Sequence, residues 1–130
     1  SRFDVYMGIG GAAEAVLAAA AVKCLGGDIL ARLAPADDKE AKQITQSHSR
    51  ELLQRHFHAE DLVRGESVVF CATGISDSYV LNGVHVEGSF ASTYTVVMRA
   101  KYRTVRYIKA THDLSRKTIR LRSAGAEAAL

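Results

Sequence analysis

A glycine-rich turn runs directly into an alanine-rich segment near the start of this chain. Gly8, Gly10 and Gly11 precede a run over 12–25 that consists almost entirely of small and apolar residues. Glycine lets the backbone approach a ligand closely, and the first N–H groups of a helix have no partner within the helix. These groups and the helix dipole favour an anion. The pattern therefore predicts a helix over 12–25 with a phosphate-binding turn at its start.

One carboxylate, Glu14, falls in the first turn of this predicted helix. A carboxylate there can share a divalent cation with a bound phosphate, because Mg²⁺ prefers oxygen ligands. The alternative is a simple turn, in which Glu14 interacts with the helix dipole alone. Two known phosphate loops are excluded. No Gly-Lys-Ser/Thr sequence follows, and Ala13 stands where the dinucleotide fingerprint needs its third glycine.

Composition is that of an ordinary soluble domain. The 130 residues suffice for one core, and the hydrophobic and charged fractions are 48% and 24%. The net charge is +3, and basic residues gather between 99 and 122. Because strand alternation divides these charges between two faces and no RNA-binding motif accompanies them, a nucleic-acid-binding module is only a minor alternative. No apolar stretch is long enough to cross a bilayer, so no membrane partner is expected.

The two cysteines and five histidines do not form a recognisable ligand set. Cys24 and Cys71 both lie in apolar stretches, which predicts two buried free thiols in a reducing compartment. His56 and His58 stand close together, but two histidines alone cannot complete a zinc site. Histidines that are solvated or structurally hydrogen-bonded are therefore the expected state.

The patterns along the chain predict an α/β fold, a mixed β-sheet with packed helices in layers. Strands are expected at 3–7, 28–33, 67–72, 84–87, 91–101 and 104–111, with the last two forming a hairpin. Helices are expected at 12–25, buried on most sides, and at 38–55, where Asp37 and Asp38 suit the N-terminal cap. A short helical turn is expected at 60–63. The strand at 67–72 is uniformly apolar, which predicts burial on both faces. One domain over 1–116 and a disordered or frayed tail over 117–130 complete the organisation.

The glycine-rich turn resembles a specific family. The string from Gly8 to Ala15, Gly-Ile-Gly-Gly-Ala-Ala-Glu-Ala, resembles the Gly-Ile-Gly-Gly-Ala-Pro-Glu-Gly segment of class II fructose-1,6-bisphosphatases. Some members of that family also cleave sedoheptulose-1,7-bisphosphate. The similarity continues in order, with Lys-Cys-Leu-Gly-Gly-Asp at 23–28, Val-Phe-Cys-Ala-Thr-Gly-Ile-Ser-Asp at 69–77 and His-Asp-Leu at 112–114. The chain thus resembles the C-terminal portion of such an enzyme.

The resemblance implies both a fold and an activity. The fold would be the C-terminal domain of the metal-dependent sugar phosphatases. The activity would be hydrolysis of the 1-phosphate of a sugar bisphosphate, in gluconeogenesis or the Calvin cycle. Carried over position by position, Gly11 becomes a substrate contact and Glu14 a ligand of Mg²⁺ or Mn²⁺. The enzyme would be cytoplasmic, or in the plastid stroma of a photosynthetic organism.

The remaining metal ligands of the family are missing from this sequence. They lie around an Asp-Pro-x-Asp-Gly-Thr motif in an earlier half of the enzyme, and no such motif occurs in these 130 residues. We therefore expect the chain alone to be inactive. We also expect a homo- or hetero-oligomer, in which an N-terminal half or a partner chain supplies the other ligands.

Several positions depart from the family pattern. Ala13 replaces a proline, Arg103 replaces a glycine in the turn between the last two strands, and Tyr94 stands where many members have histidine. Ser78-Tyr79 replaces a usual Gly-Asp pair. These departures support a second hypothesis, that of a non-catalytic, phosphatase-derived interaction subunit of a larger assembly.

Two further carboxylates, Asp77 and Asp113, follow predicted strands. Residues at strand ends are often functional in α/β proteins, so either carboxylate is a candidate for a second ligand in a local site. The alternative is a turn aspartate that accepts a hydrogen bond from its own backbone. The sequence leaves both interpretations open.

Overall fold

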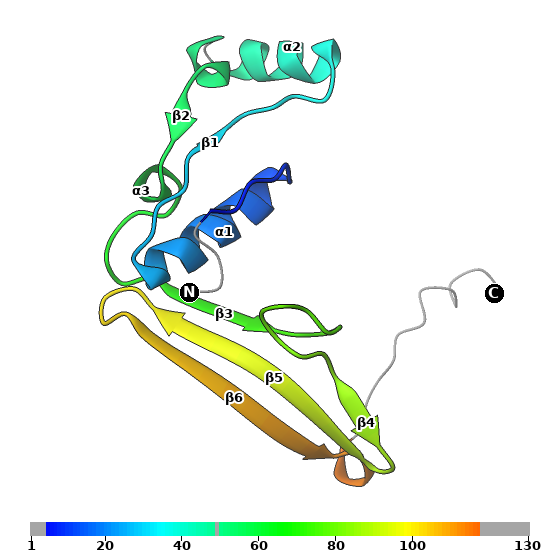
Figure 1. The fold of residues 1–130 in the computed structure, drawn as a ribbon. Coiled ribbons are helices and arrows are strands. Elements are labelled where there is room, and N and C mark those ends of the chain that lie inside the picture. The colour runs from blue at the N-terminus through cyan, green and yellow to red at the C-terminus, as the bar shows by residue number, and fades with distance from the viewer. Residues whose placement is uncertain (1–4, 49, 118–130) are drawn as a thin grey trace, which may run out of the picture. The chain divides into compact units, whose positions relative to one another are not determined.

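The computed structural model describes residues 5–48 and 50–117. Its contacts divide the chain into two compact units (Figure 1). The first unit contains the residues up to Cys71 and the segment Val97–Arg106. The second contains Ala72–Val96 and the described residues from Tyr107 onward.

The first unit holds all the α-helices of the described residues. These are α1 (Ala12–Leu25), α2 (Asp38–Ser47) and α3 (Ala59–Leu62), with the 3-10 helix η1 at Arg50–Leu53. Two short strands, β1 (Ala31–Arg32) and β2 (His56–Phe57), pair antiparallel. α1 contacts α3, and α2 contacts η1.

β5 is the strand to which the others pair. The remaining elements are β3 (Val69–Thr73), β4 (His85–Glu87), β5 (Phe90–Arg99), β6 (Thr104–Asp113) and the 3-10 helix η2 (Leu114–Arg116). β3, β4 and β6 each pair with β5, which confirms the predicted hairpin of β5 and β6. β4 and β5 pair antiparallel through a turn that contains Gly88 at φ 57°. The combination of helices and sheet agrees with the predicted fold class.

Helix α1 begins and ends at the residues that the sequence predicts. Alanine has the highest helix propensity, and it fills most of this segment. Gly26 ends the helix at φ 79°, a conformation that residues with a Cβ rarely adopt. The N–H groups of Gly26 and Gly27 donate to Lys23 O and Val22 O at 3.1 and 3.0 Å. These bonds close the C-terminal end of the helix.

The burial of α1 differs from the prediction. Ala19 and Cys24 are its buried residues, whereas Val16 and Leu17 are 42% and 59% exposed. The C-terminal half of the helix packs against α3, and most residues of its first turns are exposed. The prediction of burial on most sides was therefore wrong, because packing covers one end of the helix only.

Some predicted elements are shorter than expected. Residues 5–7 of the predicted strand over 3–7 have no regular structure, and residues 3 and 4 lie outside the described residues. The strand over 28–33 is reduced to the two residues of β1, because its partner β2 is equally short. The helix over 38–55 divides into α2 and η1. Ser47 and His48 have low helix propensity, and His48 is extended at φ −143°.

Two predictions about burial in β3 were also wrong. The strand alternates between half-buried and exposed residues, and Val69 is 58% exposed, so it is not buried on both faces. Cys71 is exposed whereas Cys24 is buried, and both are free thiols. An apolar run shows that a strand can be buried, but the elements that cover it decide whether it is. The predicted tail falls almost wholly on 118–130, outside the described residues.

Candidate metal and phosphate site at the start of helix α1

The N-termini of α2 and α3 are closed by side chains. In α2, Glu40 N–H donates to Asp37 Oδ1 at 2.7 Å, so Asp37 is the cap of the two aspartates that the sequence offered. Ala36 N–H donates to Glu40 Oε2 at 2.8 Å. In α3, His58 N–H donates to Asp61 Oδ2 at 2.9 Å. A carboxylate in the third helical position thus turns back to the chain in both helices, as in a capping box.

The N-terminus of α1 is built differently. Gly11 is its N-terminal cap and has no side chain to accept a hydrogen bond from the first turn. The first intrahelical bond runs from Ala15 N–H to Gly11 O at 3.0 Å. The earlier N–H groups of the turn have no side-chain cap, although Glu14 occupies the same helical position as Glu40 of α2. This end of α1 therefore presents N–H donors to an external acceptor.

The structure brings the two predicted site residues together. Gly11 has an ordinary φ of −69°, so its backbone conformation does not require glycine. A Cβ at this position would overlap Oε2 of Glu14 and lie 3.3 Å from its Cδ, so a larger residue would require the flexible end of the Glu14 side chain to move. The Glu14 carboxylate folds back over the backbone of Gly11. Any larger residue at 11 would displace it.

Glu14 suits a hard divalent cation as a single ligand. Its side chain is exposed, and none of the ion pairs found among the described residues involves it. It is also the only charged residue between positions 5 and 22. The described part of the chain contains no group of three or more His, Cys, Asp or Glu side chains that could hold a metal ion. A metal ion bound by Glu14 would therefore need further ligands from outside the described residues.

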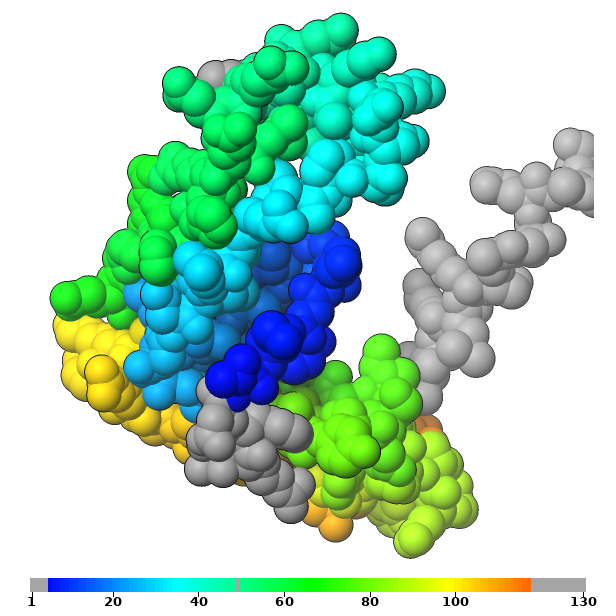
Figure 2. All heavy atoms as spheres, turned by 45° about the horizontal axis from the view of Figure 1, so that its top comes forward, coloured from blue at the N-terminus to red at the C-terminus, as the bar shows by residue number. Residues whose placement is uncertain are grey.

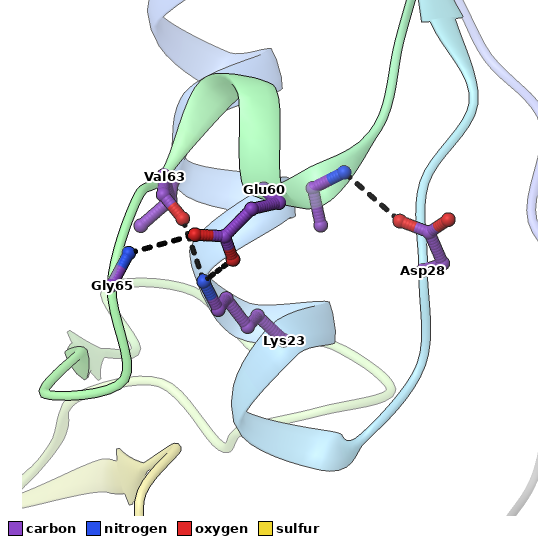
Figure 3. A network of polar contacts seen from close by, with 6 residues as sticks. Lys23, Asp28, Glu60, Val63 and Gly65 are labelled. Atoms are coloured by element: carbon purple, nitrogen blue, oxygen red, sulfur yellow. Dashed lines mark hydrogen bonds and ion pairs between the residues drawn. The ribbon is translucent and has the colours of Figure 1, made fainter.

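The opposite end of α1 is tied to α3 by charged groups (Figure 3). Lys23 is 18% exposed, and its Nζ pairs with Glu60 and donates to Val63 O at 2.8 Å. Glu60 Oε1 accepts from Gly65 N–H at 2.9 Å. The hydrogen bond from Lys23, and then that from Gly65, holds the pKa of Glu60 below its usual value. This network fixes the helix end to the loop that follows α3.

Asp28 makes a second connection to α3. Its Oδ1 accepts from Ala59 N–H at 2.9 Å, and its Oδ2 lies 2.7 Å from Nδ1 of His58. These bonds, the one from Ala59 first, lower the pKa of Asp28 to about 2. Sequence reasoning missed this connection. No local pattern signals it, because Asp28 and Ala59 are 31 residues apart in the sequence.

Asp77 and Asp113 act within their own loops. Asp77 Oδ1 accepts from Gly83 N–H at 2.7 Å and lies 3.3 Å from Nε2 of His85. Asp113 Oδ1 accepts from Ser115 N–H at 3.0 Å and caps η2. Both geometries favour the turn interpretation over a metal ligand.

The second unit contains a shallow cavity of about 230 Å³. Aliphatic side chains line it together with Tyr94, Tyr107 and Lys109. Lys109 Nζ lies 5.6 Å from the centre of the Tyr94 ring, and His85 meets the same ring edge-on at 6.0 Å. Tyr94, one of the departures from the family pattern, thus packs against its own unit.

No helix among the described residues combines the length and apolar character needed to cross a bilayer.

Comparison with known proteins identifies a family for most of the chain. A family model described as "Bacterial fructose-1,6-bisphosphatase, glpX-encoded" matches residues 1–112. The chain is 41% identical over 125 residues to the class 2 fructose-1,6-bisphosphatase of Haemophilus influenzae. It is 35% identical over 128 residues to the fructose-1,6-bisphosphatase 1 class 2 of Escherichia coli K12. These alignments cover 88% and 90% of this chain but 38% of each relative, so the chain spans little more than a third of their length.

Proposed function

We infer the function of this chain from its family: the chain belongs to the glpX-encoded bacterial fructose-1,6-bisphosphatases. We propose that it is the C-terminal part of a metal-dependent sugar bisphosphatase and has the fold of that domain. The reaction is hydrolysis of the 1-phosphate of fructose-1,6-bisphosphate, with sedoheptulose-1,7-bisphosphate as the second candidate substrate. Because the chain spans 38% of its relatives, we propose that activity also needs the N-terminal half of the enzyme.

One observation supports this proposal most directly. The carboxylate of Glu14 lies against Gly11 at the one α-helix N-terminus of the described residues that begins with glycine and lacks a side-chain cap. Anion donors and a cation ligand therefore stand side by side. A phosphate ester bound through a divalent cation needs both.

The chain's own residues have distinct roles in the proposed site. A bound Mg²⁺ or Mn²⁺ neutralises phosphoryl oxygens and lowers the pKa of a coordinated water. Glu14 supplies one oxygen ligand to that ion. The N–H groups at the start of α1 donate to the anionic phosphate, and Gly11 adds no side chain of its own beside them.

A non-catalytic interaction subunit is the alternative function. The absence of a complete ligand group among the described residues supports it, because Glu14 alone cannot hold a catalytic metal cluster. Under this alternative, adding the rest of an enzyme of this family restores no phosphatase activity.

Reconstitution separates the two functions. The chain is mixed with the unmatched portion of the Haemophilus influenzae relative, and phosphate release from fructose-1,6-bisphosphate is measured with Mg²⁺ or Mn²⁺. We expect no turnover from either part alone and turnover from the mixture. Glu14→Gln should lower kcat about 100-fold or more, since a metal ion supplies several kcal/mol of charge stabilisation. Glu40→Gln, at the same helical position of α2, is the matched control and should change little.

Gly11→Ala tests the geometry itself. Its Cβ displaces the far end of a flexible side chain, so the fold should persist while the Glu14 carboxylate moves. We expect an activity loss of about tenfold or more with an unchanged circular dichroism spectrum. Robust turnover by the isolated chain, or full activity of Glu14→Gln, would contradict the proposal.

A further inference from the structure

We propose that the cavity of the second unit is a binding site for a small aromatic carboxylate. The described residues that line it all belong to that unit, and neither Gly11 nor Glu14 is among them. They come from three segments, namely the loop residues 80–82, Tyr94 and Thr95 of β5, and residues 107–109 of β6. Binding at this cavity is therefore independent of the proposed phosphatase function.

The loop between β3 and β4 forms one wall of the cavity and is held by its own hydrogen bonds. Ser78 Oγ accepts from Leu81 N–H at 3.1 Å and donates to Leu81 O at 3.0 Å, and Asp77 Oδ1 accepts from Gly83 N–H at 2.7 Å. A Cβ at Gly83 would lie 2.7 Å from a backbone carbon of Ser76, so the two arms of the loop are in close contact. Figure 2 shows the atoms of this loop, in light green, gathered into a compact group. The wall is thus formed before a ligand binds, which reduces the entropy lost on binding.

Lys109 gives the cavity a positive charge. Among the described residues of the lining it is the one with a formal charge, and the ion pairs found in the described part of the chain do not involve it. Its Nζ lies 5.6 Å from the centre of the Tyr94 ring. The carboxylate of Asp77, in the adjoining loop, is already bonded to Gly83 N–H. An ammonium group positioned over an aromatic ring in this way is available to an anion from solution.

The other lining residues favour a flat apolar body for that anion. Tyr107 is 71% exposed and Val80 is 67% exposed, and both line the cavity together with Tyr94. Exposed aromatic rings stack with a second ring or meet it edge to face. The ligand therefore combines an aromatic ring with a negative group.

Size and donor number limit the ligand further. The cavity measures about 230 Å³, below the roughly 300–1,000 Å³ typical of sites for drug-sized molecules, so it suits a single ring rather than a nucleotide. Lys109 and the side-chain amide of Asn82 provide donors for a carboxylate with one charge. A phosphate monoester carries about two charges and three acceptor oxygens, which these donors do not satisfy.

Titration of the full chain with benzoate tests the site. Amide signals are followed by two-dimensional NMR, with benzyl alcohol as a neutral probe and acetate as an anion without a ring. We expect saturable shifts of the amides of 80–82, 94–95 and 107–109, with a Kd for benzoate of about 1 mM. Benzyl alcohol and acetate should each bind about tenfold more weakly, because each lacks one of the two features that the lining recognises.

Two lysine variants locate the charge. Lys109→Met keeps the aliphatic stem, so it should weaken benzoate binding about tenfold and leave benzyl alcohol binding unchanged. Lys101→Met is the matched control. Lys101 Nζ lies 5.5 Å from the centre of the Tyr102 ring, but both residues belong to the first unit and neither lines the cavity. This control should leave the Kd for benzoate unchanged, and the same spectra report whether each variant is folded.

Four results would overturn the site. The first is the absence of saturable shifts at benzoate concentrations about tenfold above the expected Kd. The second is equal binding of benzoate and benzyl alcohol by the unmodified chain. The third is a Lys109→Met variant that binds benzoate as the unmodified chain does. The fourth is a set of shifts that rises linearly with concentration and is spread over both units, which would show non-specific binding only.

Discussion

The polar groups at the two ends of α1 differ in whether the chain itself supplies their hydrogen-bonding partners. At the C-terminal end, Gly26 closes the backbone, and Lys23 and Asp28 bond to α3. At the N-terminal end, Gly11 supplies no cap, and the Glu14 carboxylate pairs with none of the described residues. The polar groups at the C-terminal end of α1 are therefore bonded within the chain, whereas those at the N-terminal end are free to bind a ligand or a partner.

This difference distinguishes carboxylates that stabilise the fold from a carboxylate that is available to a ligand. The carboxylates of Asp28, Glu60 and Asp61 have lowered pKa values because backbone N–H groups and basic side chains of the same unit stabilise their ionised forms. Glu14 has the same helical position as Asp61, three residues after the N-terminal cap, but no such partners among the described residues. The partners of Asp28, Glu60 and Asp61 give these carboxylates a structural role, whereas Glu14 lies beside N–H donors that have no side-chain cap.

The largest expected effect on stability comes from placing a charge at a buried position of α1 rather than at the exposed position next to it. Ala19 is fully buried, and its neighbour Ala18 is exposed. Ala19→Glu should lower the free energy of unfolding by about 3–5 kcal/mol, because the new charge is buried without a partner. Ala18→Glu should stay within about 0.5 kcal/mol. Urea unfolding measures both, and equal effects would show that Ala19 is no more tightly packed than Ala18.

The next effect concerns the closed end. Lys23→Met keeps the aliphatic stem but removes the donor to Val63 O and the partner of Glu60. We expect a loss of about 1.5–3 kcal/mol in the free energy of unfolding, the usual contribution of a hydrogen bond to a charged group. Lys39→Met, on the exposed surface of α2, is the control and should change stability by less than about 0.5 kcal/mol. If Lys23→Met left the free energy of unfolding unchanged, the network of Figure 3 would contribute nothing to stability in solution.

Arg103 offers a smaller, stabilising change near the same end. Arg103 has φ 47°, in the left-handed region. Its guanidinium lies beside Gly26, since a Cβ atom at Gly26 would be 3.1 Å from Arg103 Cζ. Arg103→Gly should raise the free energy of unfolding by about 1 kcal/mol, because the strain of a non-glycine residue is removed. Thermal unfolding measures the shift. A destabilised variant would show instead that the guanidinium at the helix end outweighs the strain.

The smallest effect is a change in acid sensitivity. Asp28 has a pKa of about 2 in the folded chain against an ordinary 3.8, so its contribution is complete above pH 3.8 and lost as pH falls toward 2. Asp28→Asn should make the acid loss of helical signal shallower in that window, as followed by circular dichroism. Glu60 and Asp61 retain part of the dependence. His58→Gln should have less effect, since Ala59 N–H is the main cause of the shift. An unchanged acid profile in Asp28→Asn would contradict the assignment.

Local features of the fold were predictable from the sequence. The bounds of α1, the cap at Asp37 and the hairpin of β5 and β6 depend on propensities and turns within a few residues. The prediction failed where distant segments decide. Val69 is exposed although its strand is apolar, and the bonds from Asp28 to α3 join residues 31 positions apart. No local pattern reports which segment will cover another.

For the candidate site, the sequence by itself determined the identity of the turn, the helical position of Glu14 three residues after Gly11, and the family to which the motif points. These are fixed by a 3.6-residue period and by residue type. Only the tertiary structure decided that one end of α1 is bonded to α3 and the other is left open. That outcome depends on which long-range contacts form, and the energy of such contacts lies in packing between segments rather than in either segment alone.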